Sequence, residues 1–184
     1  GFLVVHQGFE PVAPLVCLLA ASACLYTAGM VLNDVYDIEI DRVERPQRPL
    51  PAGEINLKNA ARLGYLLVGG GILLACASGT WSDGGGMAWR GGLVAVMLAA
   101  SILLYDGVLK ATPLAPGLMG ACRLLNVLLG MSLARPGVTD SFLGGYASYQ
   151  WMIAGGFGCY ITGVTWFART EARISSRWQL GGGV

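Results

Sequence analysis

Charged residues are scarce in this sequence. Asp, Glu, Lys and Arg make up 12% of its 184 residues, whereas 54% of the residues are hydrophobic and the mean hydropathy is +0.58. Because a soluble domain usually carries about 25% charged residues, the composition excludes an ordinary water-soluble domain and indicates helices that cross a membrane several times. The net charge of +1 offers no field that would attract nucleic acid.

Zinc and disulfide patterns are missing too. The sequence has one histidine, His6, without Cys or His partners at metal-binding spacing, and its five cysteines form no C-x-x-C pair. In membrane helices a cysteine behaves as a small apolar residue. We therefore expect neither a zinc site nor a disulfide.

The long apolar blocks predict an all-α, polytopic bundle of transmembrane helices. Five complete helices are expected, together with parts of a first and a seventh helix. The predicted helices cover residues 1–5, 12–41, 60–77, 91–110, 118–134, 150–169 and 178–184. Both ends of the sequence are apolar and lack a polar tail, so we interpret residues 1–184 as a single domain truncated at both ends.

Basic residues are distributed unevenly between the two sides of this predicted bundle. Nine fall on one side, two on the other (Arg90 and Arg135), and Arg123 lies within a helix. The nine are Arg42, Arg45, Arg48, Lys58, Arg62, Lys110, Arg169, Arg173 and Arg177. Such a bias marks the cytoplasmic side of a membrane protein.

Acidic residues cluster on that same side. Five of the eleven acids lie within residues 34–44, directly after an apolar run. Asn33, Asp34, Asp37 and Asp41 are spaced by one to four residues, so their side chains would share one face of a helix. Like charges at this spacing repel, and a hard cation such as Mg²⁺, bound together with phosphate oxygens, would compensate them. The alternative is a solvated acidic helix end, which would not need to follow an apolar run directly.

A basic loop follows the acidic cluster. Arg42, Arg45 and Arg48 recur at three-residue steps, and three prolines stiffen the segment. Arginines in such a loop could close over an anionic group as bidentate donors. The alternative is ordinary basic charge on the cytoplasmic side.

Further polar residues interrupt two of the later apolar helices. Lys110 could neutralise a diphosphate, and Asp106 could ligate a metal or pair with Lys110 four residues away; the alternative for Lys110 is a lysine that snorkels to the interface. Arg123 and Asn126 lie about two turns inside an apolar block, where a charged residue indicates a functional site. Asp34, Asp37 or a bound anion could pair with Arg123; the alternative is a structural salt bridge.

Together these segments resemble the UbiA superfamily of intramembrane prenyltransferases. The pattern N-D-x-x-D-x-x-x-D occurs at residues 33–41, R-P-x-R-P-L-P-A-G at 45–53, and Y-D-x-x-x-K-x-x-P at 105–113. The resemblance covers about residues 1–177. The C-R-x-L-N segment at 122–126 is similar to UbiA-like proteins of bacterial secondary-metabolite operons.

The resemblance implies a bundle of about nine helices around a central cavity. In that family Mg²⁺, held by two acidic motifs, binds a polyprenyl diphosphate, and the allylic cation formed from it alkylates an aromatic or lipid acceptor. The predicted function is therefore membrane-embedded prenyl transfer. The predicted site comprises Asp34, Asp37 and Lys110 as catalytic residues; Arg42, Arg48, Tyr105, Lys110, Arg123 and Asn126 for the diphosphate; and Asn33, Asp34, Asp37 and Asp41 for Mg²⁺.

The second acidic motif of the family is not evident here. At its expected place, the end of the sixth predicted helix, residues 167–177 contain one acid, Glu171, and three arginines. Either Glu171 is the remaining metal ligand, or the arginines bind the diphosphate directly, or transfer activity is lost. The last case predicts a non-catalytic UbiA-like protein that binds or transports an isoprenoid lipid. A CDP-alcohol phosphotransferase is disfavoured because Asp106-Gly107 is not followed by that family's Ala-Arg.

Overall fold

The protein is built from helices joined by turns. The computed structural model describes residues 1–81, 87–134 and 143–181, with the side chains of the last helix described as far as Arg169. The elements are α1 (Phe2–His6), α2 (Val12–Tyr36), α3 (Ile38–Glu44), α4 (Leu57–Ser78), the 3₁₀ turn η1 (Gly79–Trp81), α5 (Trp89–Leu104), the π-helical turn η2 (Tyr105–Leu109), α6 (Ala115–Gly130), the 3₁₀ turn η3 (Leu143–Gly145) and α7 (Ser148–Gly181). The predicted all-α helical bundle is confirmed.

Three of the described helical segments are long and apolar enough to cross a membrane. They cover Val12–Tyr36, Leu57–Trp81 and Trp89–Leu109, and α6 is a shorter apolar helix. A helix satisfies its own peptide groups, as the hydrocarbon of a bilayer requires. Large apolar side chains such as Leu66 and Met152 point outward and are 72% and 76% exposed. Apolar surface of this kind fits lipid contact, so the structure indicates an integral membrane protein.

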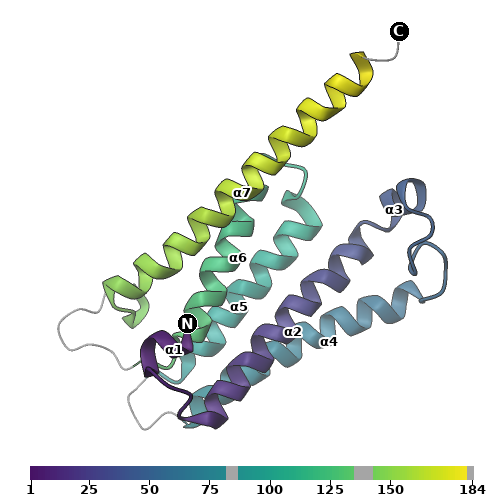
Figure 1. The fold of residues 1–184 in the computed structure, drawn as a ribbon. Coiled ribbons are helices and arrows are strands. Elements are labelled where there is room, and N and C mark those ends of the chain that lie inside the picture. The colour runs from purple at the N-terminus through teal and green to yellow at the C-terminus, as the bar shows by residue number, and fades with distance from the viewer. Residues whose placement is uncertain (82–86, 135–142, 182–184) are drawn as a thin grey trace.

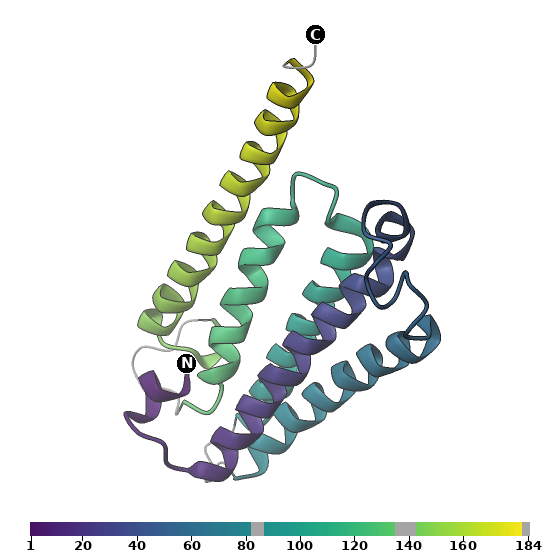
Figure 2. The same cartoon turned by 45° about the vertical axis from the view of Figure 1, so that its right-hand side comes forward.

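Consecutive long helices lie side by side (Figure 1). Helix α4 packs on α2, α5 on α4 and α6, and α7 on α6, while α2 also contacts α5 and α6 (Figure 2). Small residues allow the closest approach: a Cβ atom added to Gly64 or Gly71 on α4 would lie 2.6 Å from Leu32 or 2.8 Å from Leu25 on α2. Packing of small residues against large ones is typical of membrane helix pairs.

The second predicted helix is interrupted. Helix α2 ends at Tyr36, Asp37 has φ −86° and ψ 3°, and α3 begins at Ile38. The prediction of one helix over residues 12–41 was therefore wrong at Asp37. The break matters for function because Asp41 belongs to a different element from Asn33 and Asp34.

The C-terminal helix is longer than predicted. A helix ending at residue 169 and a new helix from 178 were expected, but α7 continues to Gly181. This prediction was wrong because charged residues end a membrane span without ending a helix. Residues 170–180 contain no glycine or proline that would stop the helix. Helix α6 begins at Ala115, before the predicted start at residue 118, and Pro116 lies in its first turn, where proline is tolerated.

The two ends of the bundle differ in polarity. The C-terminal ends of α2 and α5 and the N-terminal ends of α4 and α6 meet at one end (Figures 1 and 2), which carries the acidic cluster. At the opposite end Trp81 and Trp89 are half exposed, as expected for an interfacial belt. Arg90, predicted to lie in a loop there, is instead 1% exposed. Its guanidinium stacks 3.8 Å from the Tyr146 ring centre, and its Nη1 donates to the Ala134 carbonyl at 3.0 Å.

Candidate functional site

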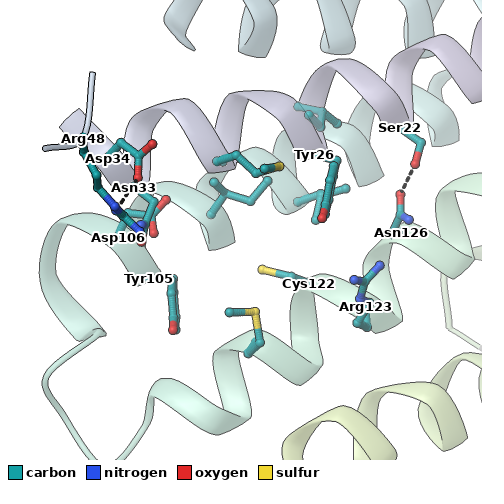
Figure 3. A pocket seen from close by; sticks show the side chains of 16 residues that line it. Ser22, Tyr26, Asn33, Asp34, Arg48, Tyr105, Asp106, Cys122, Arg123 and Asn126 are labelled. Carbon is teal, nitrogen blue, oxygen red and sulfur yellow. Dashed lines mark hydrogen bonds and ion pairs between the residues drawn. The ribbon is translucent and has the colours of Figure 1, made fainter. Parts of the chain in front are cut away.

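A cavity of about 440 Å³ lies between α2, the α5–η2 segment and α6. Its walls between the two ends are largely apolar, with Leu25, Met30, Leu98, Ile102 and Met119 among the lining residues. Polar side chains gather at two separate places along it (Figure 3). One group is Asn33, Asp34, Arg48, Tyr105 and Asp106; the other is Ser22, Arg123 and Asn126.

Lys110 binds two residues of the acidic motif, Asn33 and Asp37. Its Nζ donates to Asn33 Oδ1 at 2.6 Å and also to Asp37 Oδ2. Asn33 Nδ2 donates in turn to Asp37 Oδ2 at 3.2 Å. Asp37 caps the end of α2, where its N–H donates to the Asn33 carbonyl at 2.9 Å, and the side chains of Asn33 and Asp37 present two oxygens to one ammonium group.

Arg48 binds the other two residues of the acidic motif, Asp34 and Asp41. Its Nη1 donates to Asp41 Oδ2 at 2.8 Å and to Asp34 Oδ1 at 3.3 Å. The turn after α3 brings Arg48 back toward α2 and is closed by a hydrogen bond from Ala52 N to the Arg48 carbonyl at 2.8 Å. Asp41 is only 5% exposed. A buried carboxylate needs such a partner, so Arg48 also anchors the loop.

The four motif residues, predicted to share one helix face, therefore do not all face the cavity. Asn33 and Asp34 line the cavity, whereas Asp37 and Asp41 are absent from its lining and bind cations of the protein. Among the residues that the structure describes, no three His, Cys, Asp or Glu side chains are grouped to hold a metal. Mg²⁺ usually takes one or two carboxylates and completes its shell with water and phosphate. Asp34, at the cavity wall, fits such a partial donor set.

One of the remaining predicted residues, Arg42, is not part of the cavity lining. Arg42 pairs with Glu39 at 2.7 Å, and both side chains are exposed on α3. Glu171 lies on α7 in the part whose side chains are outside the described residues. Tyr105, by contrast, lines the cavity beside Asp106.

The π-helical turn η2 carries both Tyr105 and Asp106 and leads directly into Lys110. Such turns are rare and often occur at functional sites. Lys110 reaches across to α2, so the predicted alternative of a Lys110–Asp106 pair is not found. Within the described part of the chain, Asp106 makes no hydrogen bond or ion pair, and it lines the cavity with its side chain half-buried.

The second polar group lies farther along the cavity. Ser22 Oγ donates to Asn126 Oδ1 at 2.8 Å, and Arg123 lines the wall nearby (Figure 3). Neither carboxylate predicted for Arg123 reaches it, because Asp34 pairs with Arg48 and Asp37 with Lys110. Ser22 and Asn33 are eleven positions apart on α2, which is about 16 Å along a helix. The two polar groups are therefore separated by about three turns of α2.

Sequence reasoning missed Ser22 and Tyr26 as residues of the cavity wall. Ser22, Tyr26 and Asn33 lie within one apolar helix and all face the cavity (Figure 3). Their spacing of four and seven residues places them on one helix face, which is the signal that could have revealed them. Arg169 Nη1 donates to the Thr112 carbonyl at 2.7 Å and so ties α7 to the turn that follows Lys110.

Comparison with known proteins supports a specific family. The sequence profile of the UbiA prenyltransferase family matches residues 1–175. The digeranylgeranylglyceryl phosphate synthase of Metallosphaera sedula is 34% identical over 98 residues, which is 53% of this chain and 31% of that protein. The synthase of the same name from Methanoculleus marisnigri is 38% identical over 113 residues, 61% of this chain and 37% of that protein.

A longer match has lower identity. The digeranylgeranylglyceryl phosphate synthase of Sulfurisphaera tokodaii is 27% identical over 155 residues, 83% of this chain and 48% of that protein. The chain thus spans less than half the length of each of these three relatives. No solved structure matches the chain.

Proposed function

This chain belongs to the UbiA prenyltransferase family, and on that basis we propose that the protein transfers a prenyl group from its diphosphate to a lipid acceptor inside the membrane. The observation that carries the proposal is the cavity itself. It joins a charged end, built from Asn33, Asp34 and Arg48 with Lys110 close behind, to apolar walls. This combination suits a molecule with an anionic head and an isoprenoid tail.

The charged end has N–H hydrogen-bond donors that remain available to a diphosphate. Lys110 has three N–H donors, of which Asn33 and Asp37 occupy two. Arg48 uses only Nη1 for Asp34 and Asp41, which leaves other donors of its guanidinium group. We propose that Lys110 and Arg48 bind the phosphate oxygens while the motif carboxylates hold both cations in place. Charge-assisted bonds of this kind are among the strongest in proteins.

Mg²⁺ would be held by Asp34 together with Asn33 and phosphate oxygens. When bound, it would neutralise the diphosphate and favour its departure. Lys110 and Arg48 stabilise the same negative charge from the protein side. In the transfer step the bond between the prenyl C1 and the diphosphate oxygen breaks, and its electron pair leaves with the diphosphate. A nucleophilic atom of the acceptor forms the new bond to C1 and loses its proton.

The apolar stretch of the cavity protects that step. Leu25, Met30 and Ile102 line the region between the two polar groups. Apolar side chains keep water away from the positively charged prenyl carbon, which water would otherwise capture. The same walls provide the surface on which an isoprenoid tail can lie.

The second polar group is proposed to bind the acceptor. It offers a cation, Arg123, beside the Ser22–Asn126 hydrogen bond, and Arg123 has no ion pair among the described residues. The relatives are named for making digeranylgeranylglyceryl phosphate, a lipid that carries a phosphate. An acceptor with a lipid tail and an anionic headgroup would therefore suit Arg123.

The charged end of the bundle is proposed to face the cytoplasm. Arg48, Lys110 and Arg169 all make their contacts at this end. An excess of Lys and Arg is characteristic of cytoplasmic loops. Labelling of single cysteines placed at residues 44 and 88, in intact cells, would show which end is accessible from outside.

Transfer is tested with the full-length protein in lipid. Labelled geranylgeranyl diphosphate is supplied with a panel of acceptors that includes a geranylgeranylglyceryl phosphate and an aromatic acid. We expect a Mg²⁺-dependent prenylated product, and its loss in Asp34→Ala and Asp37→Ala. Unchanged activity in both variants would contradict the assigned site. Binding of the diphosphate without its cleavage would indicate a non-catalytic isoprenoid-binding protein instead.

A further inference from the structure

We propose that Asp106 is a direct ligand of the metal that accompanies the diphosphate, and that it acts together with Asp34. The inference rests on the proposed function, since it assigns a residue to the same site. Asp34 belongs to α2 and Asp106 to η2, and both lie at the charged end of the cavity (Figure 3). They are the two carboxylates among the described residues that line this cavity.

The pairing of charges singles out Asp106. Asp37 binds Lys110, and Asp41 binds Arg48 at 2.8 Å. Asp34 has a longer contact of 3.3 Å with Arg48. Asp106 alone of these four acids makes no hydrogen bond or ion pair within the part of the chain that the structure describes. An unpaired carboxylate at the edge of a membrane span is costly, and a bound cation would remove that cost.

The backbone keeps Asp106 available. Lys110, four residues later, is the cation nearest to Asp106 in sequence. The Lys110 ammonium, however, binds Asn33 and Asp37 instead. The turn beyond it is closed by Thr112, whose N–H donates to the Leu109 carbonyl at 3.0 Å. The π-helical turn η2 therefore leaves the Asp106 carboxylate facing the cavity, while Lys110, directly after the turn, contacts Asn33 and Asp37.

The donor chemistry fits a hard divalent cation. Two carboxylates from separate elements, with phosphate oxygens and water, form the all-oxygen environment that Mg²⁺ and Mn²⁺ prefer. The α7 side offers a cation instead, because Arg169 Nη1 donates to the Thr112 carbonyl at 2.7 Å. Metal and diphosphate would thus be bound between α2 and η2, and α7 would contribute positive charge.

The test measures metal binding directly. Mn²⁺ is titrated into full-length protein in detergent with saturating inorganic pyrophosphate, and bound Mn²⁺ is followed by electron paramagnetic resonance. We expect Asp106→Asn to weaken Mn²⁺ binding by at least about tenfold, the effect of losing roughly 1.4 kcal/mol. Asp106→Glu should recover part of the affinity. Glu44→Gln, which removes one exposed carboxylate at the same end, should bind as the wild type does.

Each result has a distinct meaning. Wild-type Mn²⁺ affinity in Asp106→Asn, with affinity lost in Asp34→Asn, would overturn the inference and leave the proposed function standing. Wild-type Mn²⁺ affinity combined with lost prenyl transfer would also overturn it, in favour of a proton acceptor. The melting temperatures of all variants are also compared. An equal loss of Mn²⁺ affinity in Asp106→Asn and Asp106→Glu, together with lowered melting temperatures, would likewise count against a ligand role. Absence of prenyl transfer in the wild type, with Mn²⁺ and pyrophosphate bound through Asp106, would refute only the proposed function.

Discussion

Lys110 and Asp37 lie 73 positions apart in the sequence, yet the ammonium of the one contacts the carboxylate of the other at the charged end of the cavity. A second cation, Arg48, forms an ion pair with the Asp41 carboxylate at the same end. The acidic motif is thus divided between two basic side chains from different segments. Protein carboxylates hold both cations at the end of the cavity where we propose that the head of a prenyl diphosphate binds.

Removing the charge of Lys110 should weaken diphosphate binding selectively. Hydrogen bonds to charged groups contribute about 1.5–3 kcal/mol, which corresponds to roughly a 10-fold to 100-fold change in affinity. We expect Lys110→Met to raise the dissociation constant for inorganic pyrophosphate by that factor, measured by calorimetry. Lys58→Met removes an exposed lysine at the start of α4 and serves as the control. Equal effects of both substitutions would argue for a general electrostatic role.

Arg123 should affect the acceptor rather than the prenyl donor. Arg123→Gln is expected to raise the KM for an anionic lipid acceptor about tenfold, the equivalent of roughly 1.4 kcal/mol. The KM for the prenyl diphosphate should stay the same, because Arg123 lies with Ser22 and Asn126, away from Asp34 (Figure 3). Arg123→Lys should retain part of the acceptor binding. A raised KM for the diphosphate alone would favour the sequence prediction that Arg123 binds the diphosphate.

Arg48 should stabilise the fold as well as the site. Arg48→Ala leaves Asp41, which is 5% exposed, without the partner that its carboxylate has in the native protein. An unsatisfied buried group costs about 1–3 kcal/mol, and we expect a lower melting temperature in detergent. Adding Asp41→Asn removes the stranded charge and should recover part of the loss. If the double variant is less stable than Arg48→Ala, Asp41 has another essential partner.

Two glycines on α6 should respond in opposite ways to alanine. A Cβ at Gly120 would lie 2.0 Å from Thr162 Oγ1 and 2.5 Å from the Gly158 carbonyl of α7, whereas a Cβ at Gly117 meets nothing within 4 Å. Overpacking costs about 1–3 kcal/mol, so Gly120→Ala should lower the melting temperature. Gly117→Ala should leave it unchanged or raised, since alanine favours helix. A stable Gly120→Ala would mean that α6 and α7 can move apart freely.

The apolar blocks and the motif spacing were sufficient to predict much of this protein. Peptide groups buried in lipid must be hydrogen-bonded within the protein, and a helix does this within one segment. The helices and their approximate bounds therefore followed from the sequence. The UbiA resemblance followed from the pattern at residues 33–41, and the family match confirmed it. The break at Asp37 and the continuous α7 were not predicted, because neither position carries the proline or glycine that usually marks a helix end.

Only the tertiary structure decided how the charges are shared. Spacing alone placed four motif residues on one face, but the break at Asp37 and the return of the loop assign Asn33 and Asp37 to Lys110, and Asp34 and Asp41 to Arg48. Spacing also allowed Asp106 to pair with Lys110 on its own turn. Which partner a charged side chain takes depends on the distances between helices, and those distances come from packing between segments far apart in the chain. The sequence by itself therefore determined the helices and the family, whereas the packing of α2 against α5 and α6 determined which carboxylates remain free to face the cavity.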